Sequence, residues 1–164
     1  MIEADITAKR IGSVYEVHVN LGKYTPSLKW DTGAKYTVIS ARMLDDDISD
    51  EALWQMKDYC EEHLKHKERF ISASGDPFYG YLSHAKDVVV GNTVLHDFYY
   101  YLVFENKRDI ALLGFDFIEN CKGFFDAHSD IIVKGFDADG YKQYEGALET
   151  NELISLIDSL SNSR

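Results

Sequence analysis

The amino-acid sequence predicts a mainly β protein with one helix in the middle of the chain and another at its C-terminal end. Short segments of alternating apolar and polar residues, rich in Val, Ile, Tyr and Phe, recur along most of the chain. Gly, Asn, Asp and Ser separate these segments, as expected for turns between strands. Two segments, about 49–66 and about 147–164, instead have the apolar spacing of amphipathic helices.

Size and charge narrow the class of protein. The 164 residues suit a single domain, 1–164, and a hydrophobic content of 45% is enough for a packed core. The formal net charge is −11 and the chain has no cluster of Lys or Arg, which argues against binding to nucleic acid through phosphates. The simplest interpretation of the acidity is solubility.

The cysteines and the apolar runs bear on the compartment. Cys60 and Cys121 are far apart with no CxxC motif, so we expect reduced thiols that pack in the interior. The start, MIEADITAKR, has no apolar segment of the kind found in signal peptides. The longest apolar runs, VVV and FYYYLVF, are too short to span a membrane. We therefore expect a cytoplasmic protein with no membrane partner.

Most of the expected elements are strands. The pattern predicts two strands within 6–22, separated by Gly12-Ser13, then strands at 26–30 and 36–40. Further strands are expected at 68–73, 78–90, 94–104 and 109–114, and two more within 123–136. Turns at Ser74–Pro77 and at Gly91-Asn92 imply two hairpins. A short helix is expected at 115–121.

The helix at 49–66 has the clearest periodicity. Asp and Ser residues at 45–50 can cap its first turn, and Lys65 and Lys67 suit its C-terminal end. Its apolar face consists of Leu53, Met56, Cys60 and Leu64.

One short motif suggests chemistry. Asp31-Thr32-Gly33-Ala34 lies between two apolar strands, a position that a surface turn alone would explain. Later in the chain, Leu112-Leu113-Gly114 opens the short helix, and between the two motifs lies a hairpin with a small, glycine-containing tip, SASGDPFYG. The joint occurrence of the three features is more specific than any one of them.

This combination resembles the retropepsin-like aspartic proteases, the family of retroviral and retroviral-like proteases. Asp31-Thr32-Gly33-Ala34 is similar to the catalytic loop of that family, Leu112-Leu113-Gly114 to its hydrophobic-hydrophobic-glycine motif, and SASGDPFYGYL to its flap. The resemblance covers about 10–136 and implies a closed β-barrel of the acid-protease fold. The helix at 49–66 is then an insertion relative to compact retroviral enzymes, and the tail at 147–164 is a candidate replacement for their terminal-strand dimer interface.

The resemblance also implies a mechanism. Two close carboxylates share one proton and activate a water that hydrolyses a peptide bond, with no metal or cofactor. The chain has one such loop, so a second copy must supply the second Asp31 in a C2 homodimer. Asp116, which follows Leu-Leu-Gly, occupies a position where the family has structure rather than catalysis.

The neighbours of Asp31 gain roles in the same way. Thr32 would bond across the two-fold axis, Gly33 would let the backbone approach the pair of carboxylates, and Ala34 would leave room for substrate. Flap residues would close over an extended peptide or protein substrate, namely Ser74, Gly75 and Asp76.

Other interpretations stay open. The chain could be a retropepsin-fold module that binds peptides without hydrolysis, or a β-rich structural domain in which the motif is a coincidence. The hairpin tip could be an ordinary loop. An intact Asp-Thr-Gly favours catalysis, because binding alone does not require that carboxylate.

The remaining motifs have simpler explanations. His63 and His66 have a spacing that metals can use, but no third ligand is evident. The DADG segment at 137–140, with Glu145, fits a polar turn better than a calcium loop. Cys60 lies on an apolar helix face rather than in a nucleophile's setting, and alternating strand faces explain Tyr99–Tyr101.

Overall fold

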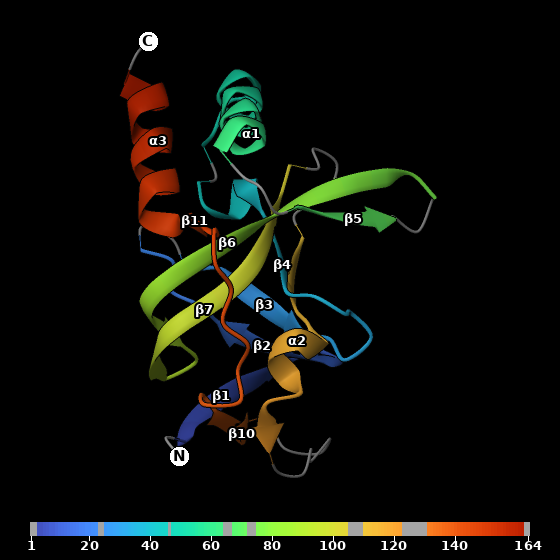
Figure 1. The fold of residues 1–164 in the computed structure, drawn as a ribbon. Coiled ribbons are helices and arrows are strands. Elements are labelled where there is room, and N and C mark those ends of the chain that lie inside the picture. The colour runs from blue at the N-terminus through green and yellow to red at the C-terminus, as the bar shows by residue number, and fades with distance from the viewer. Residues whose placement is uncertain are drawn as a thin grey trace.

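The computed structural model describes residues 3–22, 25–45, 47–63, 67–71, 75–104, 110–122 and 131–162. Strands dominate these residues, which confirms the mainly β fold class (Figure 1). The strands are β1 (Glu3–Ile11), β2 (Val14–His18), β3 (Ser27–Trp30), β4 (Val38–Ser40), β5 (Lys67–Ile71), β6 (Pro77–Val90), β7 (Thr93–Val103), β8 (Ala111–Leu113), β9 (Cys121–Lys122), β10 (Ile131–Asp137) and β11 (Leu148–Glu149). The helices are α1 (Asp50–His63), α2 (Phe115–Ile118) and α3 (Thr150–Asn162), with a 3-10 turn at Ala41–Met43.

The strands form one mixed sheet in the order β11-β6-β7-β4-β8-β3-β2-β1-β10-β9, with β5 paired to β6. The order is an open path, and it is joined back on itself by the bridge between Val19 and Val90. Two backbone hydrogen bonds flank the bridge, from Asn20 N to Val89 O (2.9 Å) and from Gly91 N to His18 O (2.7 Å). Among the described residues, the predicted closed barrel is therefore a curled sheet that is closed by one isolated bridge rather than by a continuous ladder.

Both faces of the central strands are covered. Tyr99, Tyr100 and Tyr101 are successive residues of β7, and all three are buried. They do point to alternate faces, as the period of a strand requires. The sequence predicted only that these tyrosines alternate between the two faces of a strand. In the structure, neither face of β7 is open to solvent at these three residues.

The two longer helices pack together at one end of the molecule. Ala52, Leu53, Met56 and Cys60 form the buried face of α1, as the apolar spacing predicts. Ser49 Oγ accepts a hydrogen bond from Ala52 N (3.1 Å) and so caps the first turn. The helix begins at Asp50, and 64–66, the end of the predicted range, lie outside the described residues. No helix in the described part of the chain is long and apolar enough to cross a membrane.

The C-terminal segment begins differently from the prediction. The sequence predicts helix from about 147, whereas Leu148–Glu149 first pair in parallel with Ser83 and His84 of β6. The chain then enters α3 at Thr150, whose Oγ1 donates to the carbonyl of His84 (2.9 Å). Leu153 and Ile157 bury the apolar face of α3.

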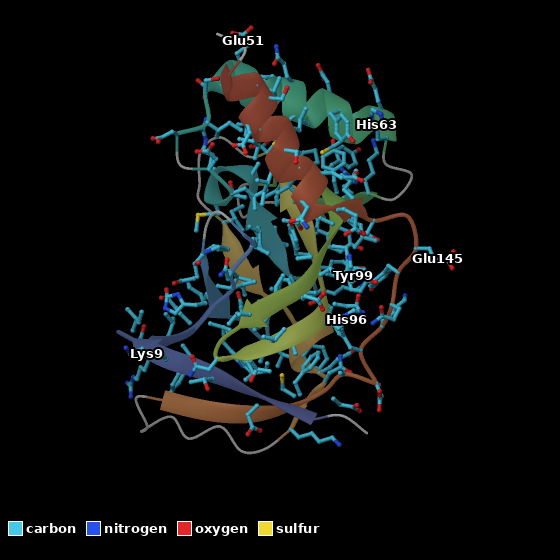
Figure 2. All side chains as sticks on the ribbon, turned by 90° about the vertical axis from the view of Figure 1, so that its left-hand side faces the viewer. Lys9, Glu51, His63, His96, Tyr99 and Glu145 are labelled. Carbon is cyan, nitrogen blue, oxygen red and sulfur yellow. The ribbon has the colours of Figure 1, made fainter. Side chains whose placement is uncertain are left out.

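The terminal strands pair within the subunit. β10 runs antiparallel to β1 from Glu3–Asp137 to Lys9–Ile131, and β9 continues the sheet on the far side of β10. This sheet lies at the opposite end of the molecule from α1 and α3 (Figures 1 and 2). Helix α3 therefore lies away from the β1–β10 pair, and its predicted part in a dimer interface stays a prediction.

Candidate active site

The Asp31 loop joins β3 to β4 and is fixed by its own backbone. Asp31 N donates to Leu113 O (3.0 Å), which continues the parallel pairing of β3 with β8. Gly33 N donates to Asp31 Oδ1 (3.0 Å), and Ala34 N donates to Asp31 O (3.2 Å). The Asp31 carboxylate is half-buried, whereas Thr32 and Gly33 are exposed. The tight turn thus presents one carboxylate at the surface of the subunit.

The first turn of α2 is hydrogen-bonded to the backbone of the Asp31 loop. Phe115 N donates to Ala34 O (2.8 Å) and Asp116 N donates to Lys35 O (3.2 Å). Gly114 allows this contact, because a Cβ there would lie 2.2 Å from the carbonyl carbon of Tyr36. The Leu-Leu-Gly motif therefore has a physical role: its strand holds Asp31, and its glycine lets the helix approach the loop.

Asp116 fixes the exit of the loop. Its Oδ2 accepts a hydrogen bond from Thr37 N (3.1 Å), and its Oδ1 accepts bonds from Thr37 Oγ1 (2.8 Å) and Phe117 N (2.8 Å). Thr37 Oγ1 in turn accepts from Gly114 N (3.1 Å). Burial raises the pKa of Asp116, and the hydrogen bonds from Thr37 oppose the increase. Both oxygens of Asp116 are engaged, so its geometry is that of a structural acceptor.

A cleft of about 530 Å³ lies between the Asp31 loop and the hairpin β5–β6. Ala34 and Tyr36 line it from the loop, and Phe70 and Phe78 line it from the hairpin. The rings of Phe70 and Phe78 stack at 5.4 Å between centroids, and Tyr36 meets Phe70 edge to face at 5.9 Å. The cleft therefore has an aromatic wall next to the turn that carries Asp31.

Gly80 makes room for that wall. A Cβ at Gly80 would lie 2.6 Å from Phe70 Cε2 and 2.9 Å from Tyr101 Cβ. The sequence motifs gave no separate role to Tyr36, Phe70, Phe78 or Gly80. A sequence signal did exist, because one phenylalanine lies on each side of the hairpin tip, Phe70 before it and Phe78 after it.

The predicted flap is present as a hairpin, but Gly75 and Asp76 at its tip are not among the described residues that line the cleft. The hairpin β5–β6 projects away from the body of the molecule (Figure 1). Gly75 has a positive φ of 88°, and both Gly75 and Asp76 are exposed. Ser74 lies outside the described residues. From the hairpin, Phe70 and Phe78 line the cleft, and they pair next to Ile71–Pro77, the last pair before the tip.

His63 and the DADG segment make local contacts. His63 Nδ1 lies 2.9 Å from Tyr59 O, and its ring stacks on the Tyr59 ring at 4.1 Å. His66 is outside the described residues, and no group of three potential metal ligands occurs among those described. Gly140 N donates to Asp137 Oδ1 (3.1 Å), so the DADG segment forms a polar turn.

Comparison with solved structures identifies the fold. The chain is similar to a retropepsin-like aspartic protease from Rickettsia conorii, with a TM-score of 0.52 and 18% sequence identity. The match covers 79% of this chain and 98% of that chain. No protein-family model and no curated protein matches the sequence. The chain therefore has the retropepsin-like fold, a conclusion that rests on structure rather than on sequence identity.

Proposed function

We propose that this chain is an aspartic endopeptidase whose active site forms between two copies. The observation that carries the proposal is the position of Asp31: one carboxylate on a braced turn, beside an apolar cleft. The retropepsin-like fold of the chain supports it as well. A cytoplasmic location is part of the proposal, and Cys60 and Cys121, which form no disulfide, fit it.

The proposed chemistry requires two carboxylates. Two neighbouring carboxyl groups cannot both ionise cheaply, so they share a proton; one accepts a proton from water and the other donates to the peptide carbonyl. Asp116 is a poor candidate for the second group, because Thr37 and Phe117 occupy its oxygens. A two-fold axis through the Asp31 loops would supply the second group, with the exposed Thr32 at the contact.

The decisive experiment is cleavage of a diverse peptide mixture between about pH 4 and pH 7, with the molecular mass of each protein measured in solution. We expect the wild-type dimer to cleave and the Asp31→Asn dimer to be inactive. Asp5→Asn is a matched control, because Asp5 is an exposed aspartate on β1. Equal cleavage by wild type and Asp31→Asn would show that Asp31 is not catalytic.

A peptide-binding module without hydrolysis is the second candidate. The aromatic cleft favours it as much as it favours the protease, because either function would use the cleft to hold an extended peptide. A wild-type dimer that binds peptides and cleaves none at any pH would support this second function.

A further inference from the structure

The cleft contains a carboxylate that the proposed hydrolysis does not use. Glu68 is half-buried on β5 and lines the cleft together with Phe70 and Phe78. No ion pair joins Glu68 to a cation within the ranges that the structure describes. A half-buried carboxylate has lost part of its hydration, so a cation brought to it would be stabilised more than one at an exposed glutamate.

The alternation of β5 separates Glu68 from the neighbouring basic residues. Glu68 and Phe70 are half-buried, whereas the alternate residues Lys67, Arg69 and Ile71 are exposed. Lys67 Nζ is 3.3 Å from Glu61 Oε2 and lies over the ring of Tyr79. Glu68 therefore shares a strand face with the aromatic wall rather than with these cations.

Two basic residues, Lys35 and Arg69, are among those that line the cleft. Lys35 is exposed, and its Nζ lies 5.1 Å from the centroid of the Tyr36 ring. Arg69 also lines the cleft but is exposed. Burial raises the pKa of Tyr101, and the charges of Tyr144 and Glu68 add smaller contributions in the same direction. The Tyr101 ring lies edge to face with Phe70, with 5.8 Å between the ring centroids.

In the part of the chain that the structure describes, one edge of β5 has no strand partner. Among the described residues β5 pairs with β6 alone. An extended peptide added at the other edge would present alternate side chains to one face, about 6.5 Å apart, at the same repeat that separates Glu68 from Phe70.

We propose that the cleft selects an extended peptide with a large apolar side chain against Phe70 and a Lys or Arg two residues away against Glu68. This inference rests on the peptide-binding cleft of the proposed function, and it names the substrate class. The net charge of −11 acts in the same direction, because it draws cationic peptides toward the protein.

The test measures binding separately from cleavage. Three fluorescent peptides share one Phe and differ two residues away, where they carry Lys, Gln or Glu. Their affinities are measured by fluorescence anisotropy on the Asp31→Asn protein, which removes hydrolysis, with Glu68 intact, as Glu68→Gln and as Glu68→Lys. Glu51→Gln makes the same charge change at the far end of α1 from His63 (Figure 2), and it controls for overall charge.

We expect the Lys peptide to bind about fivefold more tightly than the Gln peptide when Glu68 is present. The preference should vanish in Glu68→Gln, reverse toward the Glu peptide in Glu68→Lys, and persist in Glu51→Gln. Equal affinities with Glu68 intact, a preference that survives Glu68→Gln, or no binding of any peptide would each overturn the inference. A Lys preference in a wild-type protein that never hydrolyses would support the inference while rejecting the protease.

Discussion

Thr37 and Asp116 show how single residues hold the Asp31 loop in place. They are distant in sequence, yet three hydrogen bonds among Thr37, Asp116 and Gly114 tie the exit of the loop to α2. The loop is therefore preorganised by the fold of one subunit. Preorganisation of this kind matters for catalysis, because a reacting group that is already oriented lowers the barrier.

Asp116→Asn should loosen this connection. An asparagine that keeps its oxygen at the Oδ1 position turns an amide N–H toward Thr37 N, so a hydrogen bond becomes a contact between two donors. We expect a loss of about 1–3 kcal/mol in the free energy of unfolding, measured by urea denaturation at pH 7. Asp5→Asn should have little effect, and equal stability of the two variants would contradict the assignment.

The same residue predicts a pH dependence. Because burial raises the pKa of Asp116 above 3.8 in the folded chain, its protonated form is favoured by folding. This contribution to stability is fully present when the pH is below the pKa of Asp116 in the unfolded chain. It is lost as the pH rises through the higher pKa of Asp116 in the folded chain. The stability advantage of wild type over Asp116→Asn should therefore decline as the pH rises from about 4, and an advantage that grows with pH would refute it.

Cys60 offers a prediction that is independent of catalysis. The side chain is fully buried. Burial, with a smaller contribution from the charge of Glu61, raises the pKa of the Cys60 thiol to about 12. The thiolate is the reactive form, so Cys60 should resist alkylation by iodoacetamide at pH 8 in the native protein. Mass spectrometry should find Cys60 modified only after denaturation. Rapid native labelling would show that α1 opens readily.

At the scale of elements, the hairpin β5–β6 forms the wall of the cleft that faces the Asp31 loop. Gly80→Ala should displace Phe70, because the new Cβ would overlap its ring and the Cβ of Tyr101. We expect destabilisation of about 1–3 kcal/mol, seen as a lower Tm, together with weaker peptide binding. The double variant Gly80→Ala/Phe70→Leu should recover part of the stability. No recovery would place the strain at Tyr101 instead of Phe70.

The elements also show what the sequence can and cannot predict. Periodicity located α1 and the hairpin strands, because those segments are long enough for the pattern to be read. The pairing of Leu148–Glu149 with β6 was missed, because a two-residue strand has no period. The aromatic residues that line the cleft were missed for a related reason: Tyr36 and Phe70 meet through tertiary contact, which no local pattern records.

The sequence predicted a loop at Asp31 because a motif marks it. It predicted only part of the set of contacts that holds the loop in place. The sequence assigned a structural role to the position of Asp116, but it did not reveal that Thr37 is the partner. The closed barrel was predicted from family resemblance, whereas the degree of closure depends on one bridge between Val19 and Val90. Details of this kind depend on how the sheet curls, which hydrophobic patterning does not determine.

At the scale of the whole molecule, charge should govern association. Two subunits that each carry −11 repel one another, and added salt screens that repulsion. We expect the dimer dissociation constant, measured by sedimentation equilibrium, to fall between about 0.05 M and 0.5 M NaCl. The constant should also fall as the pH approaches the pI of about 4.9. A dimer that weakens with salt would point to an interface held by ion pairs.

The pairing of β10 with β1 has a consequence for how copies of the chain mix. Seven residue pairs form between β1 and β10 inside one chain, so this pairing needs no second copy, and we expect subunits of the proposed dimer to exchange. Excess Asp31→Asn chains would then capture wild-type chains in hybrids that hold a single carboxylate. If each active enzyme needs two intact copies, residual activity should follow the square of the wild-type fraction. The inactive variant would then inhibit the wild-type protein by forming mixed dimers with it.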